Sequence, residues 1–143
     1  METAHLGVIL DSSIVIEAER QGLNAAQFLR HIVLKLGEME AALCSITVAE
    51  LVHGICRANT AERRERRRSF LDDELKAALP VYEISAVTAE LVGTIGAESS
   101  AAGMTIPFDD LLIAACALER GYAIATRNVR HFQEIPGLKL IAL

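Results

Sequence analysis

The chain has no tryptophan, and phenylalanine and tyrosine together make up only 4% of its 143 residues. This scarcity disfavours nucleic-acid binding in which bases stack on an aromatic platform. No apolar run approaches the length of a membrane span, and the N-terminal sequence METAHLGVIL lacks the basic region that opens a signal peptide. We therefore expect a cytoplasmic protein that makes no use of a membrane.

Several common catalytic motifs are absent as well. The three cysteines are widely spaced, lie in apolar surroundings and fit no zinc or disulfide spacing. There is no glycine-rich phosphate loop and no GxSxG elbow, so covalent serine chemistry has no support. The histidines form no HxH or HExxH pattern, which disfavours a zinc site. We expect most of them at the surface or half buried: His5, His31, His53 and His131.

What the chain does contain is enough apolar sequence for a substantial core. Hydrophobic residues make up 52% and charged residues 23%, the balance of a globular protein. Short apolar strands alternate with helical patterns, and no linker or repeat divides residues 1–143. The pattern predicts a single domain of the α/β class, a three-layer α/β/α sandwich around a mainly parallel central sheet.

The expected elements follow from apolar periodicity and from capping residues. The expected strands are 6–10, 42–46, 81–84, 122–126 and 138–141. The expected helices are 13–20, 24–36, 47–57, 60–79, 85–103 and 110–119. Asn24 is the expected N-cap of the second helix, and Gly121 is the expected C′ residue of the last one.

The net charge of −5 has the wrong sign for a general nucleic-acid binder. Six of the fourteen lysine and arginine residues nevertheless fall within residues 57–68. Helical spacing lets Glu62 and Glu65 pair with neighbouring arginines, which favours a solvated helix face. Because arginine outnumbers glutamate in this run, contacts with phosphates are the alternative interpretation.

Acidic residues interrupt the most apolar stretches of the chain. They are Asp11 in GVILDSSIVI, Glu50 in CSITVAELVHG, and Asp109 with Asp110 in IPFDDLLIAACAL. A charge beside a buried strand or helix is costly unless it is paired or bound to a metal. Ligands of open α/β sheets bind beyond the carboxyl ends of the strands, where Asp11 falls. The pattern therefore predicts a site for a hard cation in a metal-dependent hydrolase.

Local structure offers another explanation for each acid. Asp11 could cap the helix that follows, although either adjacent serine would serve, and Ser13 could instead orient the Asp11 carboxylate. Thr47 and Glu50 fit a capping box in which Thr47 is the N-cap. The two adjacent aspartates point about 100° apart on a helix, so one would cap it while the other projects into the site. Helix geometry alone gives only a weak preference for which of Asp109 and Asp110 projects into the site.

Together these segments resemble the PIN-domain ribonucleases, and in particular the VapC-type toxins of bacterial toxin–antitoxin pairs. The resemblance rests on VILDSSIVIEAE, SITVAELVHGI and IPFDDLLIAACALERGYAIATRNVRHFQEIPGLKLI. It assigns the catalytic and metal-binding roles to Asp11, Glu50 and Asp110. The fourth position of the family's site falls on Asn128, where many relatives have an acid. Asn128 could bind a metal weakly, hold a metal-bound water or contact substrate, and Asp109 could partly compensate.

The resemblance also implies how such a protein works. It implies one or two Mg²⁺ ions, with Mn²⁺ as an alternative, and a metal-activated water that cleaves phosphodiester bonds in single-stranded or looped RNA. It further implies a homodimer and neutralisation by a small antitoxin, as in type II toxin–antitoxin systems. Because Asn128 replaces an acid and the net charge is negative, the alternative is a catalytically weak or inactive PIN-like module that binds RNA or a protein partner.

Overall fold

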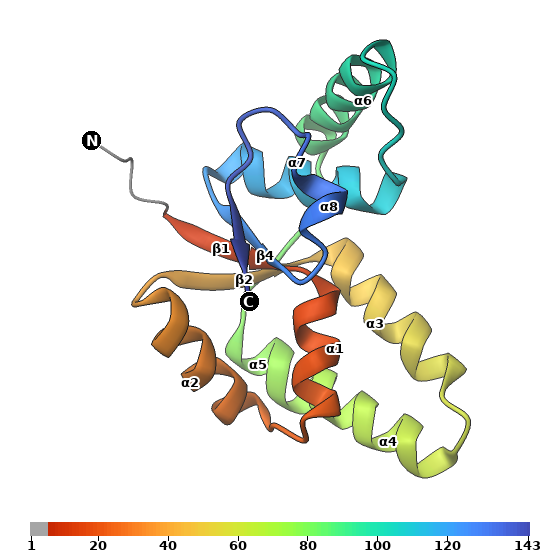
Figure 1. Ribbon diagram of the computed structural model, residues 1–143. Coiled ribbons are helices and arrows are strands. Elements are labelled where there is room, and N and C mark those ends of the chain that lie inside the picture. The colour runs from red at the N-terminus through yellow and green to blue at the C-terminus, as the bar shows by residue number, and fades with distance from the viewer. Residues whose placement is uncertain (1–5) are drawn as a thin grey trace.

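A computed structural model describes residues 6–143, and its centre is a five-stranded sheet (Figure 1). The strands are β1 (Gly7–Leu10), β2 (Glu40–Cys44), β3 (Val81–Tyr82), β4 (Ala123–Thr126) and β5 (Leu140–Ala142). They lie in the order β3-β2-β1-β4-β5, and every neighbouring pair is parallel. Each strand that the sequence predicted is present, with both ends within two residues of the predicted ones.

Helices cover both faces of the sheet, which confirms the predicted α/β/α architecture (Figure 1). One face carries α1 (Ser12–Arg20), α2 (Ala25–Leu36), α3 (Ser45–Arg57), α4 (Ala61–Ser69), the π-helical stretch η1 (Phe70–Leu75) and α5 (Lys76–Ala78). The other face carries α6 (Ala86–Ala101), α7 (Phe108–Arg120) and α8 (Val129–Phe132). The helix predicted for 60–79 is thus three consecutive segments, and α8 was not predicted. Within residues 6–143, no helix is both long enough and apolar enough to cross a membrane.

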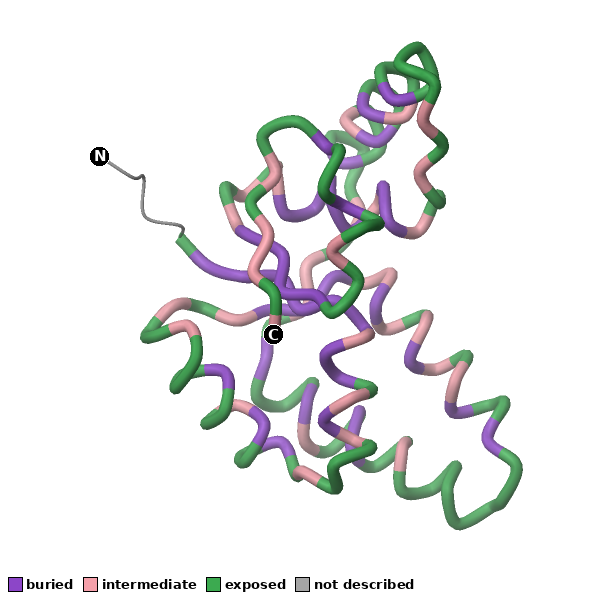
Figure 2. The backbone as a smooth tube through the Cα atoms, viewed as in Figure 1, coloured by how far each residue is buried: buried purple, intermediate pink, exposed green. Residues whose placement is uncertain are grey.

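The alternation of side chains along the strands divides the core into two layers. Val8 and Leu10 pack with the helices on the α1 side of the sheet. Ile9 and Ile124 point the other way and pack against α7. All residues of β1 and β4 are buried (Figure 2), as expected for parallel strands that helices cover on both faces.

Two helix ends that local chemistry predicted are confirmed. Asn24 caps α2, because its Oδ1 accepts a hydrogen bond from the Gln27 backbone N–H at 2.8 Å. Gln27 completes a capping box by accepting from the Asn24 N–H at 2.9 Å. Gly121 ends α7 with a φ of 68°, a left-handed conformation that favours glycine.

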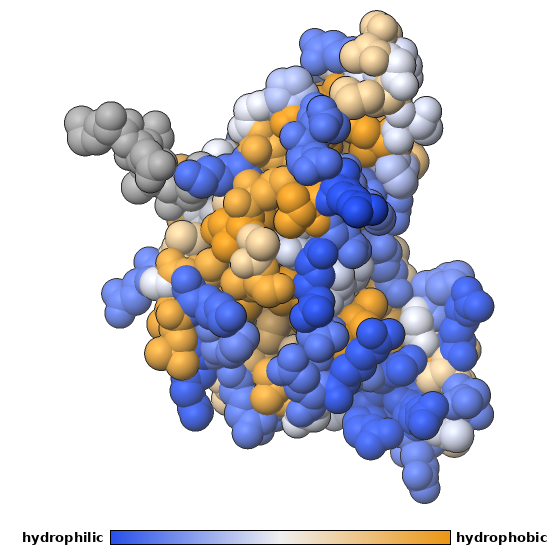
Figure 3. Space-filling view, in the orientation of Figure 1, coloured by the Kyte–Doolittle hydropathy of each residue, from blue (hydrophilic) through white to orange (hydrophobic). Residues whose placement is uncertain are grey.

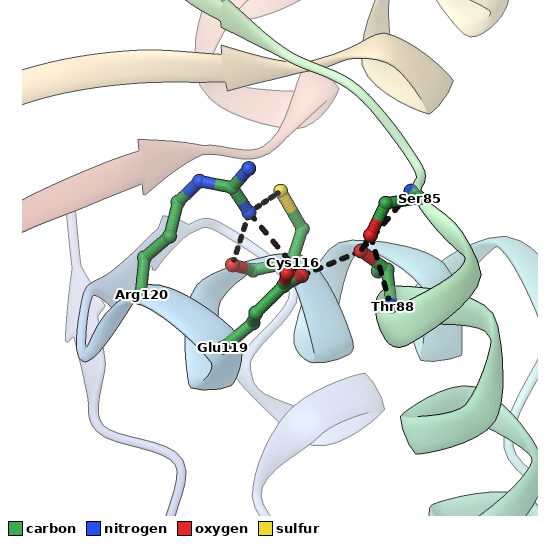
Figure 4. Close-up of polar contacts among 5 residues, drawn as sticks. All are labelled: Ser85, Thr88, Cys116, Glu119 and Arg120. Atoms are coloured by element: carbon green, nitrogen blue, oxygen red, sulfur yellow. Dashed lines mark hydrogen bonds and ion pairs between the residues drawn. The ribbon is translucent and has the colours of Figure 1, made fainter.

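Polar contacts at the far end of α7 tie this helix to α6 (Figure 4), and a cation–π contact ties it to the sheet edge. Thr88, near the start of α6, donates from Oγ1 to the Glu119 carboxylate. Arg120 donates from Nη1 to the Cys116 carbonyl oxygen at 3.3 Å. The guanidinium carbon of Arg120 also lies 4.1 Å from the centroid of the Tyr82 ring on β3, a cation–π contact. These contacts fix the direction in which the opposite end of α7 points.

The arginine-rich run forms α4, and the surface over this helix is hydrophilic (Figure 3). Arg67 Nε lies 2.6 Å from Glu19 Oε1, which joins α4 to α1. Arg68 Nη1 lies 3.8 Å from Asp72 Oδ2, one helical turn further on. Two ion pairs that the sequence predicted within the run do not form among the described residues: those of Glu62 and Glu65. Arg67 and Arg68 pair with α1 and η1 instead, whereas Arg63 and Arg64 donate to the loop residues Asn59 and Ala58.

Gly7, at the start of β1, leaves no room for a side chain. A Cβ at this position would lie 2.7 Å from the Glu40 carbonyl oxygen and 2.7 Å from the Tyr122 ring. We expect Gly7→Ala to lower the free energy of unfolding by about 1–3 kcal/mol, as measured by urea denaturation. Gly93→Ala on α6 is the matched control, because its Cβ would meet no heavy atom within 4 Å. It should raise stability by about 0.5–1 kcal/mol. Equal stability of Gly7→Ala and the wild type would contradict this packing.

Candidate active site

Asp11 directly follows β1 at the carboxyl edge of the sheet, and its side chain is held by two hydroxyl groups. Asp11 Oδ2 accepts hydrogen bonds from Ser13 Oγ and from Thr126 Oγ1, both at 2.8 Å. The residue is 4% exposed, and its backbone N–H donates to the Ala125 carbonyl at 3.0 Å. Asp11 occupies the N-cap position of α1 but makes no side-chain cap hydrogen bond. The capping explanation is therefore wrong for its carboxylate.

Glu50 lies in the second turn of α3. The predicted capping box is wrong, because β2 leads straight into α3 and moves the N-cap back to Cys44. Thr47 is therefore inside the helix and fully buried. Glu50 Oε1 is buried and has no hydrogen-bond partner among residues 6–143. Burial, and next the negative charge of Asp109, raises the pKa of Glu50 to about 7.

Asp109 and Asp110 both lie in the first turn of α7, whose N-cap is Pro107. Neither aspartate caps the helix, so the role of cap predicted for one of them is wrong. Asp110 is 7% exposed, and its Oδ2 lies 3.0 Å from His131 Nδ1. Burial and Asp109 raise the pKa of Asp110 to about 6, although His131 opposes the shift. The positive end of the α7 dipole favours negative charge in this turn.

The segment after β4 adds backbone contacts around Asp11. The Asn128 N–H donates to Thr126 Oγ1 at 2.9 Å, and the Arg127 N–H donates to Ser13 Oγ at 3.1 Å. Asn128 itself is exposed. Its position beside Thr126 places it at the rim of the acidic cluster.

The structure therefore brings the acids that the sequence predicted together at one edge of the sheet. The negative charges of Asp11, Asp109 and Asp110 each raise the pKa of Glu50, which requires that they lie near it.

Sequence reasoning missed two further residues, Thr126 and His131. Thr126 carries a weak signal, as the one polar residue of a buried apolar strand. His131 carries none, because α8 was not predicted, while His31 and His53 are exposed as expected. His5 lies outside the described residues.

The chemistry of this cluster fits a hydrated divalent cation. No lysine or arginine of residues 6–143 forms an ion pair with any of the four carboxylates, and Glu50 contributes a buried oxygen without a partner. No three His, Cys, Asp or Glu side chains in the described part of the chain enclose an ion by themselves. Mg²⁺ suits this arrangement because it typically binds one or two carboxylates and keeps several waters.

Sequence and fold both match a known family. Residues 8–138 match the PIN domain, and the chain belongs to the PIN domain family. It is 27% identical to ribonuclease VapC1 of Rickettsia felis over 96% of this chain and 97% of that protein. It is 30% identical to the tRNA(fMet)-specific endonuclease VapC of Shigella flexneri, over 94% of this chain and 96% of that protein. Within the PIN domain family, these relatives place the chain with the VapC ribonucleases.

A solved structure supports the same placement. The structure of VapBC2 from Rickettsia felis bound to a promoter DNA fragment matches with a TM-score of 0.81 and 26% identity. The match covers 95% of this chain and 98% of the other. Fold and sequence therefore agree on a VapC-type PIN domain, and the acidic cluster lies within the matched residues.

The raised pKa of Glu50 predicts how stability depends on pH without metal. Its folded-state pKa of about 7 exceeds the ordinary value of 4.5, so the folded protein holds this proton more tightly than the unfolded chain. The contribution of Glu50 to the free energy of unfolding is fully present below about pH 4.5 and is lost as the pH rises through about 7. Asp110 acts in the same direction.

We therefore expect the free energy of unfolding in EDTA to fall by about 1–2 kcal/mol between about pH 5 and pH 8, after allowance for solvent screening. Urea denaturation at both pH values measures this fall. Glu50→Gln should remove much of it, whereas Glu38→Gln at an exposed position should not. A fall that is as steep in Glu50→Gln as in the wild type would refute the assignment.

Proposed function

We propose that the protein is a metal-dependent endoribonuclease, the toxin of a type II toxin–antitoxin system, and that residues 1–143 form one PIN domain. Asp11, Glu50 and Asp110 would hold Mg²⁺, or Mn²⁺ in its place. The observation that carries the proposal is a group of desolvated carboxylates that no lysine or arginine of the described residues pairs with, and above all the buried oxygen of Glu50, which has no hydrogen-bond partner among those residues. Buried negative charge of this kind is costly unless a cation offsets it.

The residues in and around the cluster would have different roles in RNA cleavage. A bound divalent ion supplies an activated water and neutralises charge on the phosphate. Ser13 and Thr126 hold the Asp11 carboxylate in one orientation through their hydrogen bonds. Asn128, as a neutral amide at the rim, can contact the phosphate or the sugar without repelling it, and Asp109 adds negative charge close to Glu50. Exposed Arg127 and Arg130 beside Asn128 would attract the RNA backbone.

The substrate would be RNA. One relative is specific for tRNA(fMet), so initiator tRNA is the first substrate to test. A chain that bound RNA or a protein partner but cleaved nothing with Mg²⁺ or Mn²⁺ would instead be the inactive PIN-like module.

Single carboxylate-to-amide changes test this proposal. We expect Asp110→Asn and Asp11→Asn each to lower the rate of tRNA cleavage in Mg²⁺ about 100-fold or more, because each removes a ligand charge. Asp110→Asn should also unfold at an equal or higher urea concentration, since it relieves repulsion among the acids. Asp73→Asn, at an exposed position of η1, is the matched control and should cleave normally. Cleavage that persists in either site variant would count against the proposed metal ligands.

The proposed antitoxin would bind in a groove between α1, α3 and η1 that reaches the acidic cluster at Glu50. The groove has a volume of about 220 Å³ and a largely apolar wall, with Ile16, Leu51 and Phe70 among its lining residues. An apolar segment that carries a cationic residue would complement both the wall and the carboxylates. The proposed homodimer rests on the family resemblance.

Filling the groove should separate antitoxin binding from catalysis. Gly54 lines the groove, and a Cβ built on it meets no heavy atom within 4 Å. We expect Gly54→Leu to weaken antitoxin binding at least about tenfold in calorimetry, because the new side chain occupies the space of the ligand. Gly93→Leu on α6, also with open space at Cβ, should bind normally. If both variants bind the antitoxin equally well, the groove is not its site.

A further inference from the structure

His131 is the one histidine of the described residues whose ring nitrogen lies within ion-pair distance of a carboxylate of the acidic cluster. Its Nδ1 lies 3.0 Å from Asp110 Oδ2, within hydrogen-bond distance. The Asp110 side chain is 10% exposed and that of His131 is 50% exposed. The ring therefore lies at the outer edge of the cluster and contacts one of its buried aspartates.

The backbone around His131 is held firmly against α7. Phe132 and Ile135 are 1% and 3% exposed, and both pack in the same core layer as Ile113 of α7. The His131 N–H also donates to the Asn128 carbonyl at 3.0 Å, which closes the short helix α8. Because α7 and α8 share one packed layer, the spacing between Asp110 and His131 is set by the core and not by a mobile loop.

We propose that His131 is a positioning residue, which donates from Nδ1 to Asp110 Oδ2 and so keeps the Asp110 carboxylate turned towards Asp11 and Glu50 for binding a divalent cation. Without this donor, repulsion from the neighbouring carboxylates would favour rotation of Asp110 towards solvent. Carboxylates that bind metals are commonly held by such outer hydrogen bonds, whose removal weakens metal binding. The inference rests on the proposed metal-dependent nuclease.

A competing role for His131 is direct contact with RNA. The ring also lines a cleft of about 330 Å³, together with Pro107, Arg130 and Glu134. Substrate contact from this cleft would raise KM for RNA without changing metal affinity. Positioning of Asp110 would change metal affinity even when no RNA is present.

Two amide substitutions distinguish which ring nitrogen matters. The side-chain nitrogen of Asn occupies nearly the place of histidine Nδ1, whereas that of Gln reaches the place of Nε2. We expect His131→Asn to bind Mn²⁺ within about threefold of the wild type in calorimetry without RNA. His131→Gln and His131→Ala should bind it about 10–100-fold more weakly. At saturating Mn²⁺, kcat of His131→Ala should recover towards the wild-type value while KM for tRNA changes little.

Controls separate folding, the inference and the proposed function. His31→Ala, at an exposed histidine on α2, should leave Mn²⁺ binding unchanged, and urea denaturation checks that every variant folds. If His131→Ala does not fold, the comparison of Asn with Gln still decides the matter. Unchanged Mn²⁺ affinity in His131→Gln, rescue by Gln but not by Asn, or a raised KM alone would overturn the inference while the nuclease stands. A wild-type protein that neither binds Mn²⁺ nor cleaves RNA would overturn both.

Discussion

Negative charge gathered at the carboxyl edge of a parallel sheet, with no lysine or arginine partner among residues 6–143, is the constraint on which the rest of the site depends. Asp11, Glu50 and Asp110 are each withdrawn from water, and their charges repel one another. Neighbouring groups reduce this repulsion separately for two of the carboxylates. Two hydroxyls donate hydrogen bonds to Asp11, and His131 contacts Asp110. Glu50 alone is left with a buried oxygen unsatisfied. The fold thus stores an electrostatic cost that a bound dication would offset.

The sheet topology explains why residues so distant in sequence share this edge. β1 and β4 are adjacent and parallel, so the residue after β1 meets the last residue of β4, and Asp11 meets Thr126. α3 begins directly where β2 ends, which brings Glu50 to the same edge. α7 packs across these strands with its first turn at the site, and its other end is tied to α6 and β3. Three parts of the fold, namely β1 with β4, α3 and α7, therefore set the positions of the carboxylates.

The sequence predicted the architecture and the identity of the clustered acids, because buried strands and charges inside apolar runs leave strong local signals. The failures have a common physical cause. The capping roles of Thr47 and of one of the α7 aspartates depended on where a helix begins, and a strand or a proline at the junction moved that point. Thr126 and His131 act through contacts with residues far away in the chain, and no local pattern records such contacts. Family resemblance, rather than local chemistry, chose Asp110 over Asp109.

The order of the strands determines when the acidic cluster can form during synthesis of the chain. β4 lies between β1 and β5, although it follows β1 by more than 110 residues in the chain. A nascent chain of 110 residues already contains every acid of the cluster, but it lacks the strand whose threonine holds Asp11 and the helix whose histidine holds Asp110. Non-local pairing of this kind forms late and slowly. A protein that cuts RNA would thus be harmless to the ribosome that makes it at least until β4 and α8 have been synthesised.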